Sequence, residues 1–284
     1  MNFKDIYSKP KLHISIEIFP PKDEAGVTSL FEALEDLSAL QPAFISVTYG
    51  AMGSTRDLTH DLALRIKNEC KLPVASHFTC VGSGKTQIQD YIEKLKSAGI
   101  DLVVALRGDA PKGSAFVAPA DGFQYANELV TYLKSLNGFS LAVAGYPEKH
   151  IEAASAEIDL DNLKRKVDAG ADIILTQMFF DNEYYFDFVE RARARGITIP
   201  IVPGIMPIMN VKQVEKIAGM CGARIPATLH EQLLAKATDT LAQREIGVEQ
   251  AIKQCQELKK AGVPGIHFYS MNKSYSVMKV IAAL

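Results

Sequence analysis

The first candidate for chemistry is a single carboxylate, Glu17, which interrupts an apolar segment in the sequence HISIEIFPP. Side chains alternate between the two faces of a β-strand, so Ile14, Ile16 and Ile18 lie on one face and Glu17 on the other. Burial disfavours the charged form of a carboxyl group, and we expect a raised pKa that keeps Glu17 protonated near neutral pH. Such a group can act as a general acid. The alternative is a structural partner for a buried Lys or Arg.

Two later segments also end in side chains that could contact a ligand. The segment ALRGD places the cation Arg107 and the anion Asp109 on either side of Gly108, whose missing side chain lets the backbone approach a ligand closely. His77 lies near the end of the segment VASHFT. A salt-bridged strand end and a core histidine are the respective structural alternatives.

A charged helix and a strand-terminal amide complete the candidates. In the helix predicted after YPEKH, Asp159, Asn162 and Lys166 share one face and Arg165 lies beside it. A solvated face is the usual meaning of such a charge run. Gln177 ends a strand in LTQMFFD, where its amide could read the donor and acceptor edge of a flat heterocycle. The alternative is a buried amide that is satisfied by the backbone.

The glycine-rich segment GSGKT, residues 82–86, resembles a phosphate-binding loop but fails both common patterns. A P-loop requires glycine five residues before its second glycine, where this chain has Thr79. The dinucleotide pattern G-x-G-x-x-G requires glycine where this chain has Gln87, and it occurs nowhere else in the chain. Any dinucleotide must therefore be held by other means.

The elements that must position these residues alternate between short β-branched segments and longer amphipathic ones, which indicates repeated βα units and a parallel sheet. Eight units in a chain of 284 residues predict a closed (β/α)8 TIM barrel. The active site of such a barrel lies at the carboxyl ends of its strands. The predicted strands are 13–18, 44–48, 74–78, 102–106, 140–144, 173–177, 199–202 and 265–268.

Amphipathic helices are predicted between these strands, several of them followed by a glycine in the C-cap position. Residues 224–261 leave room for two or three helices without a strand, which we interpret as a helical insertion before the last strand. No linker or repeat divides the chain, so we expect a single catalytic barrel domain over residues 1–284. The clearest helices are 24–40, 58–69, 87–98, 124–136, 156–169 and 183–195.

Composition narrows the class of partner. A formal net charge of −2 gives no electrostatic basis for binding nucleic acid or an anionic membrane, so we expect a small-molecule substrate. The four cysteines show no spacing suited to zinc, and we predict no metal site. Neither a signal peptide nor an apolar run of transmembrane length is recognisable, which leads us to expect a cytoplasmic protein.

Nine segments spread over almost the whole chain resemble, in order, those of the bacterial methylenetetrahydrofolate reductase family: FPP after Glu17, VTYGA, HFTC, ALRGD, YPE..H, NLKRKVDAGAD, TQ.FFD, PGI.P and HFY..N. The resemblance implies a (β/α)8 barrel that carries non-covalent FAD. In this family NADH or NADPH reduces the flavin. Flavin N5 then passes hydride to 5,10-methylenetetrahydrofolate in a ping-pong sequence. The product, 5-methyltetrahydrofolate, serves one-carbon metabolism and methionine biosynthesis.

The resemblance also implies roles for individual residues. By matching position, Glu17 is the general acid that protonates N10 of the folate, and Asp109 lies by the pterin and flavin, where it stabilises the developing cation. Gln177 and Gln213 contact the folate, and Gln177 and Thr48 approach the nicotinamide. The residues that the resemblance assigns to FAD are Tyr49, Ala51, His77, Arg107, Gly108, Asp109, Ala126, Tyr146, His150, Ala153, Asp159, Asn162, Arg165 and Lys166.

Two positions depart from the enterobacterial members of the family. Ile217 replaces a phenylalanine that stacks on the bound ligand, and Lys273 replaces a substrate-binding arginine by a point charge without a bidentate fork. We therefore expect changes in folate and nicotinamide binding. Because the regulatory domain of eukaryotic relatives has no counterpart here, we expect no inhibition by adenosylmethionine. We also expect a homo-oligomer, whose size the sequence does not fix.

Two other functions are compatible with a barrel of this kind. A Schiff-base aldolase would need a lysine at the end of a strand, and none of the predicted strands ends in one. A non-catalytic barrel that binds flavin or folate would be expected to lack the acid, whereas Glu17 and Asp109 are both present.

Overall fold

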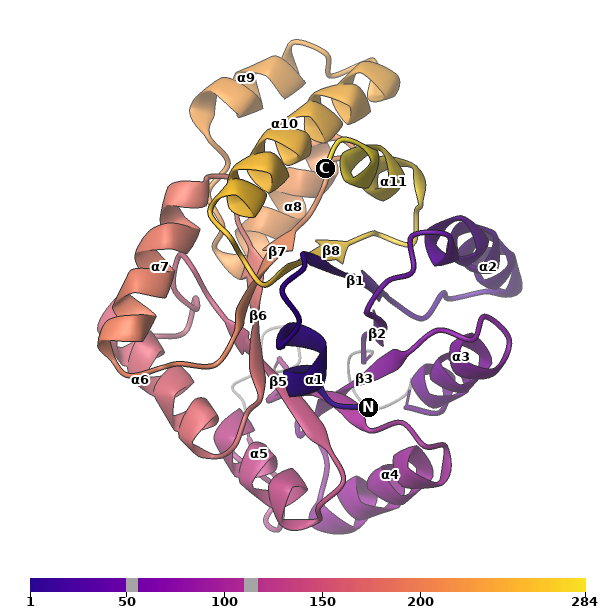
Figure 1. The fold of residues 1–284 in the computed structure, drawn as a ribbon, viewed down its shortest axis with the longest axis vertical. Helices are drawn as coiled ribbons and strands as arrows, with labels where there is room; N and C mark the ends of the chain where they lie inside the picture. Colours follow the sequence, from indigo (N-terminus) through magenta and orange to yellow (C-terminus); the bar gives the residue numbers. More distant parts are fainter. Residues whose placement is uncertain (50–55, 110–116) are drawn as a thin grey trace.

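Eight parallel strands close into a barrel in the computed structural model, which describes residues 1–49, 56–109 and 117–284 (Figure 1). Each strand pairs with the next along the chain, and the last pairs with the first, so the predicted (β/α)8 barrel is confirmed. The strands are β1 (His13–Ile18), β2 (Phe44–Val47), β3 (Val74–Thr79), β4 (Leu102–Leu106), β5 (Ser140–Gly145), β6 (Ile173–Met178), β7 (Ile201–Ile205) and β8 (Gly265–Tyr269).

The predicted bounds of the seventh strand, 199–202, were wrong. The strand β7 runs over Ile201–Ile205 and includes the Pro-Gly pair that the sequence suggested as its end. Gly204 is required inside the strand, because a side chain there would come within 2.2 Å of the Thr176 carbonyl oxygen. Proline and glycine therefore mark close packing here rather than a turn.

Helices surround the barrel, as the ring in Figure 1 shows. The predicted insertion is confirmed, since two helices and no strand separate α8 from β8. Among the described helices none is long and apolar enough to cross a membrane. The helices are α1 (Phe3–Tyr7), α2 (Glu24–Ser38), α3 (Arg56–Asn68), α4 (Lys85–Ser97), α5 (Ala126–Ser135), α6 (Ala156–Asp168), α7 (Asn182–Ala194), α8 (Val211–Cys221), α9 (Ala227–Leu234), α10 (Thr240–Lys260) and α11 (Tyr275–Ala282).

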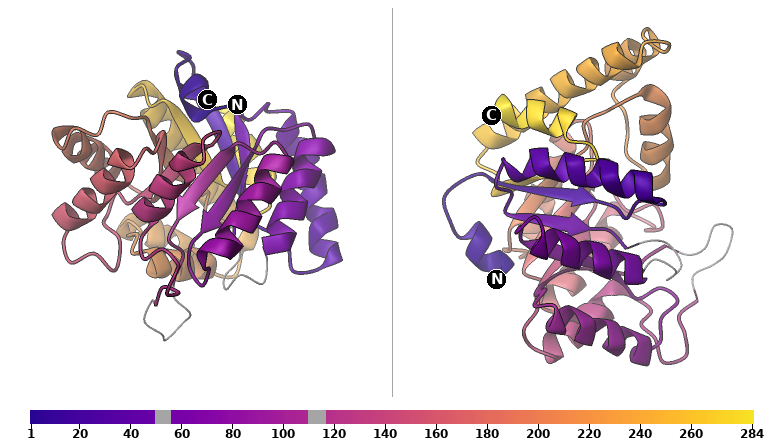
Figure 2. Two further views of the ribbon diagram at one scale, coloured as in Figure 1. Left: turned by 90° about the horizontal axis from the view of Figure 1, so that it is seen from below. Right: turned by 90° about the vertical axis from the view of Figure 1, so that its right-hand side faces the viewer.

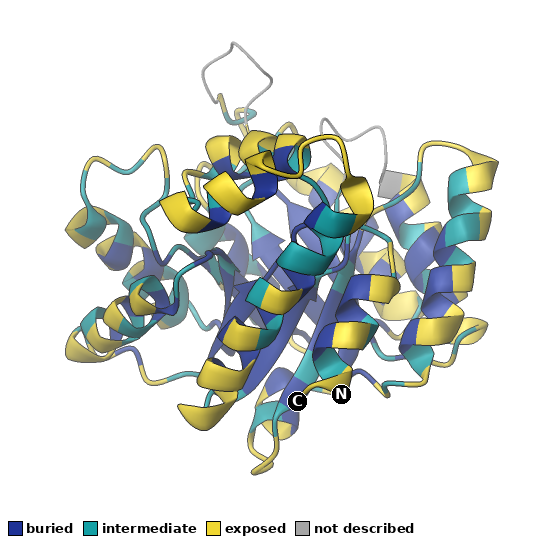
Figure 3. Ribbon diagram, turned by 90° about the horizontal axis from the view of Figure 1, so that it is seen from above, coloured by how far each residue is buried: buried dark blue, intermediate teal, exposed yellow. Residues whose placement is uncertain are grey.

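The described residues form three apolar clusters, one between strands and helices, one inside the barrel and one around α8 and α9. In Figure 3 the strands are largely buried, whereas the helices are exposed on their outer side. The short helix α1, which the sequence did not predict, lies across one end of the barrel (Figures 1 and 2). Its Phe3 and Ile6 are buried against the inner core, and each such burial stabilises the fold by about 2 kcal/mol. The backbone N–H of Phe3 donates to the hydroxyl of Ser140, the first residue of β5. Helix α1 therefore closes the amino-terminal end of the barrel.

Polar side chains replace apolar ones toward the carboxyl ends of the strands. Alternation along β1 and β8 turns four side chains into the barrel, because Ile16, Ile266 and Phe268 beside them pack between the strands and the helices. The inward side chains are Ser15, Glu17, His267 and Tyr269. Closure of the barrel pairs Glu17 with Tyr269 across the β1–β8 ladder. Residues from the two ends of the sequence thus face each other inside the open end of the barrel.

Candidate active site

The carboxylate of Glu17 lies between two histidine rings inside the barrel. Its Oε2 atom is 3.3 Å from Nε2 of His77 on β3 and 3.5 Å from Nε2 of His267 on β8. The side chain of Glu17 is 19% exposed, whereas that of His267 is completely buried. Glu17 is thus the member of this cluster that a ligand in the barrel mouth could reach.

The raised pKa expected for Glu17 is wrong for this structure. Burial by itself would raise the pKa, but the charge of His77, the hydrogen bonds to His267 and His77, and the charge of His267 together lower it to about 2. Sequence alone placed the carboxylate in the barrel but did not place two imidazoles beside it. The charges and hydrogen bonds of the two histidines together outweigh the effect of desolvation on this pKa.

The ring of His267 is held from its other side by β1. The hydroxyl oxygen of Ser15 lies 2.8 Å from Nδ1 of His267, and both groups are fully buried. The ring also stacks on Phe44, with centroids 6.0 Å apart. Sequence reasoning did not select Ser15 or His267. The period-2 alternation of GIHFY, which places His267 and Tyr269 on the inner face, could have identified the histidine.

The end of β4 brings Arg107 to the barrel mouth as predicted, but in a bidentate ion pair with a residue that the sequence did not suggest. Nη1 and Nη2 of Arg107 donate to the carboxylate of Glu152 over 2.6 and 2.8 Å. Gly108 adopts φ +86°, and a side chain there would come within 2.5 Å of Val81. Asp109 is exposed, and its charge helps to raise the pKa of Arg107, after the Glu152 hydrogen bond as the main cause.

The segment after β5 is folded onto itself through several hydrogen bonds. The ring of Tyr146 meets that of His150 edge-on, with centroids 4.6 Å apart, and the backbone N–H of His150 donates to the Asp159 carboxylate over 2.9 Å. Lys149 adopts a left-handed φ of +91° and donates to the carbonyls of His150 and Ala153. Three of the predicted cofactor-binding residues in the loop, Tyr146, His150 and Ala153, are therefore brought together with Asp159 of α6.

The predicted charged face of α6 divides into an outer and an inner part. Arg165 and Asn162 are exposed and are joined by a hydrogen bond of 2.5 Å. Lys166 instead turns toward the barrel, where its Nζ donates to the Ala144 carbonyl over 2.6 Å. Desolvation lowers the pKa of Lys166 to about 8, although the charge of Asp159 acts against it. A wholly solvated face, the usual meaning of such a charge run, does not describe α6.

A β-bulge lies at Gln177. The register between β6 and β7 passes from Leu175 opposite Val202 to Met178 opposite Gly204, so β6 contains one extra residue. The Oε1 atom of Gln177 accepts a hydrogen bond from the N–H of Met178 over 2.9 Å. Part of the amide is thus satisfied by the backbone, as the structural alternative supposed, and a ligand would meet the remaining part.

The hydroxyl of Tyr269 spans the interior beside this bulge. It donates to the Thr176 carbonyl of β6 over 2.7 Å. The missing side chain of Gly204 leaves room for the ring, since a side chain would come within 2.7 Å of it. The barrel mouth is therefore braced from β8 to β6.

The remaining candidates vary in how directly they face the mouth. Thr48 follows β2 and its N–H donates to the Ile18 carbonyl. The ring of Tyr49 packs between Phe78 and Tyr91 on the helix side of the barrel, so contact with a cofactor would fall to its main chain.

Three further candidates lie near helix ends, and one lies outside the described residues. Ala126 is the half-buried first residue of α5, and the N–H of Gln213 is capped by Asn210 at the start of α8. Lys273 is exposed, with its Nζ 3.3 Å from the Ser29 hydroxyl of α2. Ala51 falls in the gap 50–55.

The residue that departs from the family pattern on α8 is Ile217. It is partly buried and packs against an apolar cluster that includes Met206 and Leu229. This position therefore contributes to the packing of α8 and α9 beside the barrel mouth.

A parallel barrel with its acids, bases and amides gathered at the carboxyl ends of the strands defines an enzyme of the TIM-barrel class. Comparison with known proteins identifies the family. The model of the methylenetetrahydrofolate reductase family matches residues 2–284, and the chain belongs to this family of oxidoreductases.

Relatives and solved structures agree with that assignment. The 5,10-methylenetetrahydrofolate reductase of Escherichia coli (strain K12) is 40% identical over 264 residues, which cover 93% of this chain and 88% of the relative. Methylenetetrahydrofolate reductase (NADH) 1 of Arabidopsis thaliana is 39% identical over 99% of this chain and 50% of its own. An uncharacterized Clostridium thermocellum protein that binds two copies of 5-methyl-5,6,7,8-tetrahydrofolic acid has the same fold, with a TM-score of 0.65, 15% identity and coverage of 100% and 97%.

The aldolase alternative gains no support from the structure. The strands end at residues such as Ile18, Thr79, Met178 and Tyr269, and none of the eight described strands ends in lysine. The half-buried Lys166 comes from helix α6 and contacts a carbonyl oxygen of β5.

Proposed function

We propose that this protein catalyses the FAD-dependent reduction of 5,10-methylenetetrahydrofolate to 5-methyltetrahydrofolate, with NADH or NADPH as reductant. This reaction would supply one-carbon units for methionine biosynthesis. The observation that carries the proposal is Glu17, a partly exposed carboxylate held between His77 and His267 at the open end of the barrel. A proton donor at this place is what opening of the folate five-membered ring requires.

The residues of the β5–α6 region fit a cofactor with a diphosphate. Lys166 is a desolvated cation whose described acceptor is a neutral carbonyl, so an anionic group beside it would favour its charged form. Arg165 lies next to it on α6, and Arg107 presents a bidentate fork from β4. We propose that these cations hold the diphosphate, while Tyr146, His150, Ala153, Asp159 and Asn162 line the remainder of the cofactor, with Thr48, Tyr49, Ala51, His77, Gly108, Asp109 and Ala126 at its other contacts.

The remaining roles belong to residues of the barrel mouth. We propose that Glu17 delivers a proton to N10 of the folate, which opens the ring and leaves an electrophilic iminium at N5. The exposed carboxylate of Asp109 would stabilise that positive charge. Gln177 and Gln213 would bind the pterin, with Lys273 at the substrate and Thr48 at the nicotinamide. The flavin, when bound, would accept hydride from the nicotinamide and give it to the folate in a separate half-reaction.

Three of the proteins compared with this chain support the proposal. The Escherichia coli relative is named for the reaction, and the name of the Arabidopsis relative specifies NADH. The Clostridium protein of the same fold binds the methylated folate that this reaction would produce.

An absorbance experiment tests the proposal directly. The purified protein, reconstituted with FAD, is mixed anaerobically with NADH and then with 5,10-methylenetetrahydrofolate. We expect the flavin band to bleach with NADH and to return with the folate, which would demonstrate both half-reactions in ping-pong order. Failure of FAD to bind would contradict the proposal. A bound flavin that only NADPH bleaches would change the reductant alone.

We also propose a cytoplasmic homo-oligomer. The four cysteines are all free thiols, two of them buried, which suits a reducing compartment. Large apolar side chains, including Met220 and Leu241, are exposed on α8 and α10, where a second copy could cover them. Light scattering of the purified protein measures the state; a monomer at all concentrations would contradict this part.

A further inference from the structure

The turn that follows β8 continues the contact between β8 and β1 beyond the last paired residues of these strands. The ladder between them ends with Glu17 opposite Tyr269. The hydroxyl of Ser270 then donates to the Glu17 carbonyl over 2.7 Å, and the backbone N–H of Ser270 donates to the same oxygen over 3.3 Å. Asn272 contacts Phe19, the residue that follows β1. The turn therefore holds the backbone at Glu17 and again two residues later.

The amide of Asn272 is bonded to the backbone of Phe19 in both directions. The N–H of Phe19 donates to Oδ1 of Asn272 over 3.0 Å, and Nδ2 of Asn272 donates to the Phe19 carbonyl over 2.8 Å. Two residues of an antiparallel sheet exchange N–H···O bonds in the same way. An asparagine side chain can replace one of them, because its amide carries a donor and an acceptor. Asn272 therefore does for Phe19 what a neighbouring strand would do.

The sequence after Phe19 makes this contact important for the course of the chain. Pro20 and Pro21 follow, and proline has no backbone N–H. A proline also restricts the residue before it to extended conformations. The bond from Phe19 to Asn272 is thus the last one by which a backbone donor can fix the chain before the proline pair.

The backbone of the turn is itself unfavourable. Met271 and Asn272 have left-handed φ values of +52° and +57°, a region that is uncommon for residues other than glycine. Such conformations persist where the surrounding structure holds them, and they cluster at active sites. The turn is held by the Asn272 N–H, which donates to the Ser270 hydroxyl over 3.2 Å, and by the Lys273 N–H, which donates to the Ser270 carbonyl over 3.0 Å. The chain adopts this backbone where it brings the Asn272 amide against Phe19.

The carboxylate of Glu17 has longer contacts than its backbone. Its Oε2 atom lies 3.3 Å from Nε2 of His77 and 3.5 Å from Nε2 of His267. The bonds from the Ser270 hydroxyl and from the Asn272 amide nitrogen to the backbone are 2.7 and 2.8 Å long. The place of the carboxylate in the barrel mouth therefore depends on how firmly the end of β1 is held.

We propose that Asn272 is a positioning residue of the active site, whose side-chain amide fixes Phe19 and thereby holds the Glu17 carboxylate in its place. The inference rests on the proposed acid role of Glu17. Asn272 acts through the backbone, whereas Glu17 would contact the folate. A general acid must lie within hydrogen-bond reach of its acceptor, and small displacements of a reacting group slow a reaction strongly. The effect should be confined to the folate step, since reduction of the flavin by NADH takes no proton from Glu17.

The first test compares two asparagines that have the same backbone conformation. Asn272→Gly removes the amide and leaves a residue that adopts positive φ without strain. Asn137→Gly is the matched control, because Asn137 has a φ of +51°, is exposed, and lies between α5 and β5 at the amino-terminal end of the barrel. In the flavin-loaded protein we expect single-turnover folate reduction to fall by about 10- to 100-fold in Asn272→Gly only, with flavin reduction by NADH within about twofold.

A second readout of the same experiment separates positioning from structural damage. The folate concentration that gives half of the maximal rate should change by less than about threefold in Asn272→Gly, because an acid that is displaced affects the transition state and not the binding of the substrate. A general loss of structure would weaken FAD binding and slow both half-reactions together. That result, or an unchanged folate step, would overturn the proposal.

Hydrogen exchange tests the contact without any reaction. In the flavin-loaded protein, mass spectrometry of a peptide covering residues 13–21 should show about one more exchanging amide in Asn272→Gly and none in Asn137→Gly. Asn272→Asp keeps the accepting oxygen and the size of the side chain but loses the donor to the Phe19 carbonyl. It should leave the Phe19 amide protected and still slow the folate step, which keeps the test decisive if Asn272→Gly does not fold.

The two measurements also separate this inference from the proposed function. Rapid exchange of the Phe19 amide in the unsubstituted protein, or equal exchange in the two glycine variants, would overturn the role of Asn272. Absence of any flavin chemistry in the unsubstituted protein would instead refute the proposed function, and the exchange result would still report the contact between Asn272 and Phe19.

Discussion

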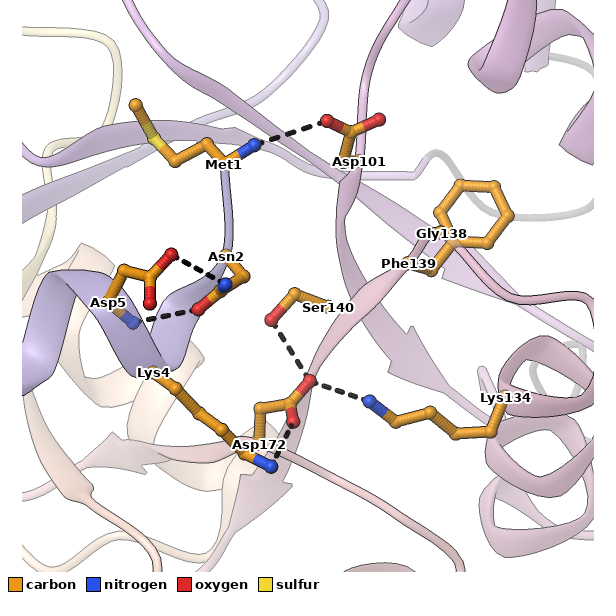
Figure 4. Close-up of a pocket in the computed structure, with 10 residues that line it drawn as sticks. All are labelled: Met1, Asn2, Lys4, Asp5, Asp101, Lys134, Gly138, Phe139, Ser140 and Asp172. Carbon is orange, nitrogen blue, oxygen red and sulfur yellow. Dashed lines mark hydrogen bonds and ion pairs between the residues drawn. The ribbon is translucent and has the colours of Figure 1, made fainter.

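Two carboxylates lie at opposite ends of this barrel, Asp172 buried and Glu17 half-buried, and their hydrogen-bond partners differ greatly. At the amino-terminal end the Asp172 carboxylate accepts hydrogen bonds from the Lys134 ammonium over 2.8 Å and from the Ser140 hydroxyl over 2.9 Å (Figure 4). It also accepts one from the backbone N–H of Leu141 over 2.8 Å. Lys4 of α1 adds an ion pair at 3.3 Å. Each oxygen of Asp172 thus has a cationic partner, and the network fastens α1 to the barrel.

Glu17 at the carboxyl-terminal end has no comparable set of donors. Two imidazole nitrogens approach one of its oxygens, at 3.3 and 3.5 Å, which is longer than each of the three hydrogen bonds that Asp172 accepts. The comparison teaches that a fully satisfied buried charge fixes structure, whereas an incompletely satisfied one keeps the freedom to exchange a proton. Four predictions would break or sharpen this contrast.

The largest effect is expected from Glu17→Gln. Because the amide cannot supply a proton, folate reduction should fall by about 10²- to 10⁴-fold while flavin reduction by NADH persists. Stopped-flow absorbance of each half-reaction measures the change. The matched control is Asp172→Asn at the other end of the barrel, which should leave both half-reactions nearly intact in the folded protein. Normal folate turnover in Glu17→Gln would refute its role as the acid.

Asp172→Asn should have the opposite effect to Glu17→Gln: it should lower the stability of the folded protein and leave the rates of both half-reactions nearly unchanged. We expect a loss of about 2 kcal/mol in the free energy of unfolding at pH 7, as for other buried networks that lose one partner, measured by urea denaturation. Burial would raise the pKa of Asp172, but the Lys134 and Leu141 hydrogen bonds and the Lys134 charge lower it.

The sign of the pH dependence follows from that lowered pKa. A carboxylate whose pKa is lowered by folding stabilises the protein when the pH is above the ordinary aspartate pKa of about 3.9. This stabilisation is lost as the pH falls below that value and through the lowered pKa. The stability difference between the unsubstituted protein and Asp172→Asn should therefore shrink on acidification below about pH 4. A difference that grows in acid would contradict the assignment of Asp172 as a structural anchor.

A third, smaller effect is expected in the pH dependence of FAD affinity, because Lys166 should take up a proton when the cofactor binds. Desolvation lowers its pKa to about 8, and an adjacent diphosphate should raise it again. FAD affinity should then be constant below about pH 8 and fall by up to about tenfold per pH unit above it. Fluorescence titration with FAD measures this. Lys166→Arg, which stays charged, should lose the dependence if it binds FAD; the same slope in both proteins would contradict the role of Lys166.

The smallest effect is expected from Glu152→Gln. Its carboxylate occupies the Arg107 fork, and because the pair is largely solvent-exposed on the glutamate side, its removal should strengthen FAD binding by only about two- to fivefold. The exposed Glu157 of α6 offers a control, since Glu157→Gln removes the same charge away from Arg107. Equal affinities of the two variants would show that Glu152 does not compete with the cofactor.

Much of the fold could be predicted because it depends on local pattern. Alternation of βα units determined eight strands, and period-2 alternation separated Glu17 from the isoleucines of its strand. The bulge at Gln177 and the inclusion of Pro203 and Gly204 in β7 could not be read from the sequence, because both depend on how Tyr269 packs across the barrel.

By itself the sequence determined the barrel, the family resemblance and the side chains available at the mouth. Only the tertiary structure decided what those side chains do to one another. Closure of β8 against β1 brings Ser15 and His267, which are 252 positions apart, to 2.8 Å. The same closure of the barrel places His77 and His267 beside Glu17, and these two rings reversed the predicted pKa shift of Glu17, because electrostatic effects depend on distance in space, which a linear pattern of residues does not contain.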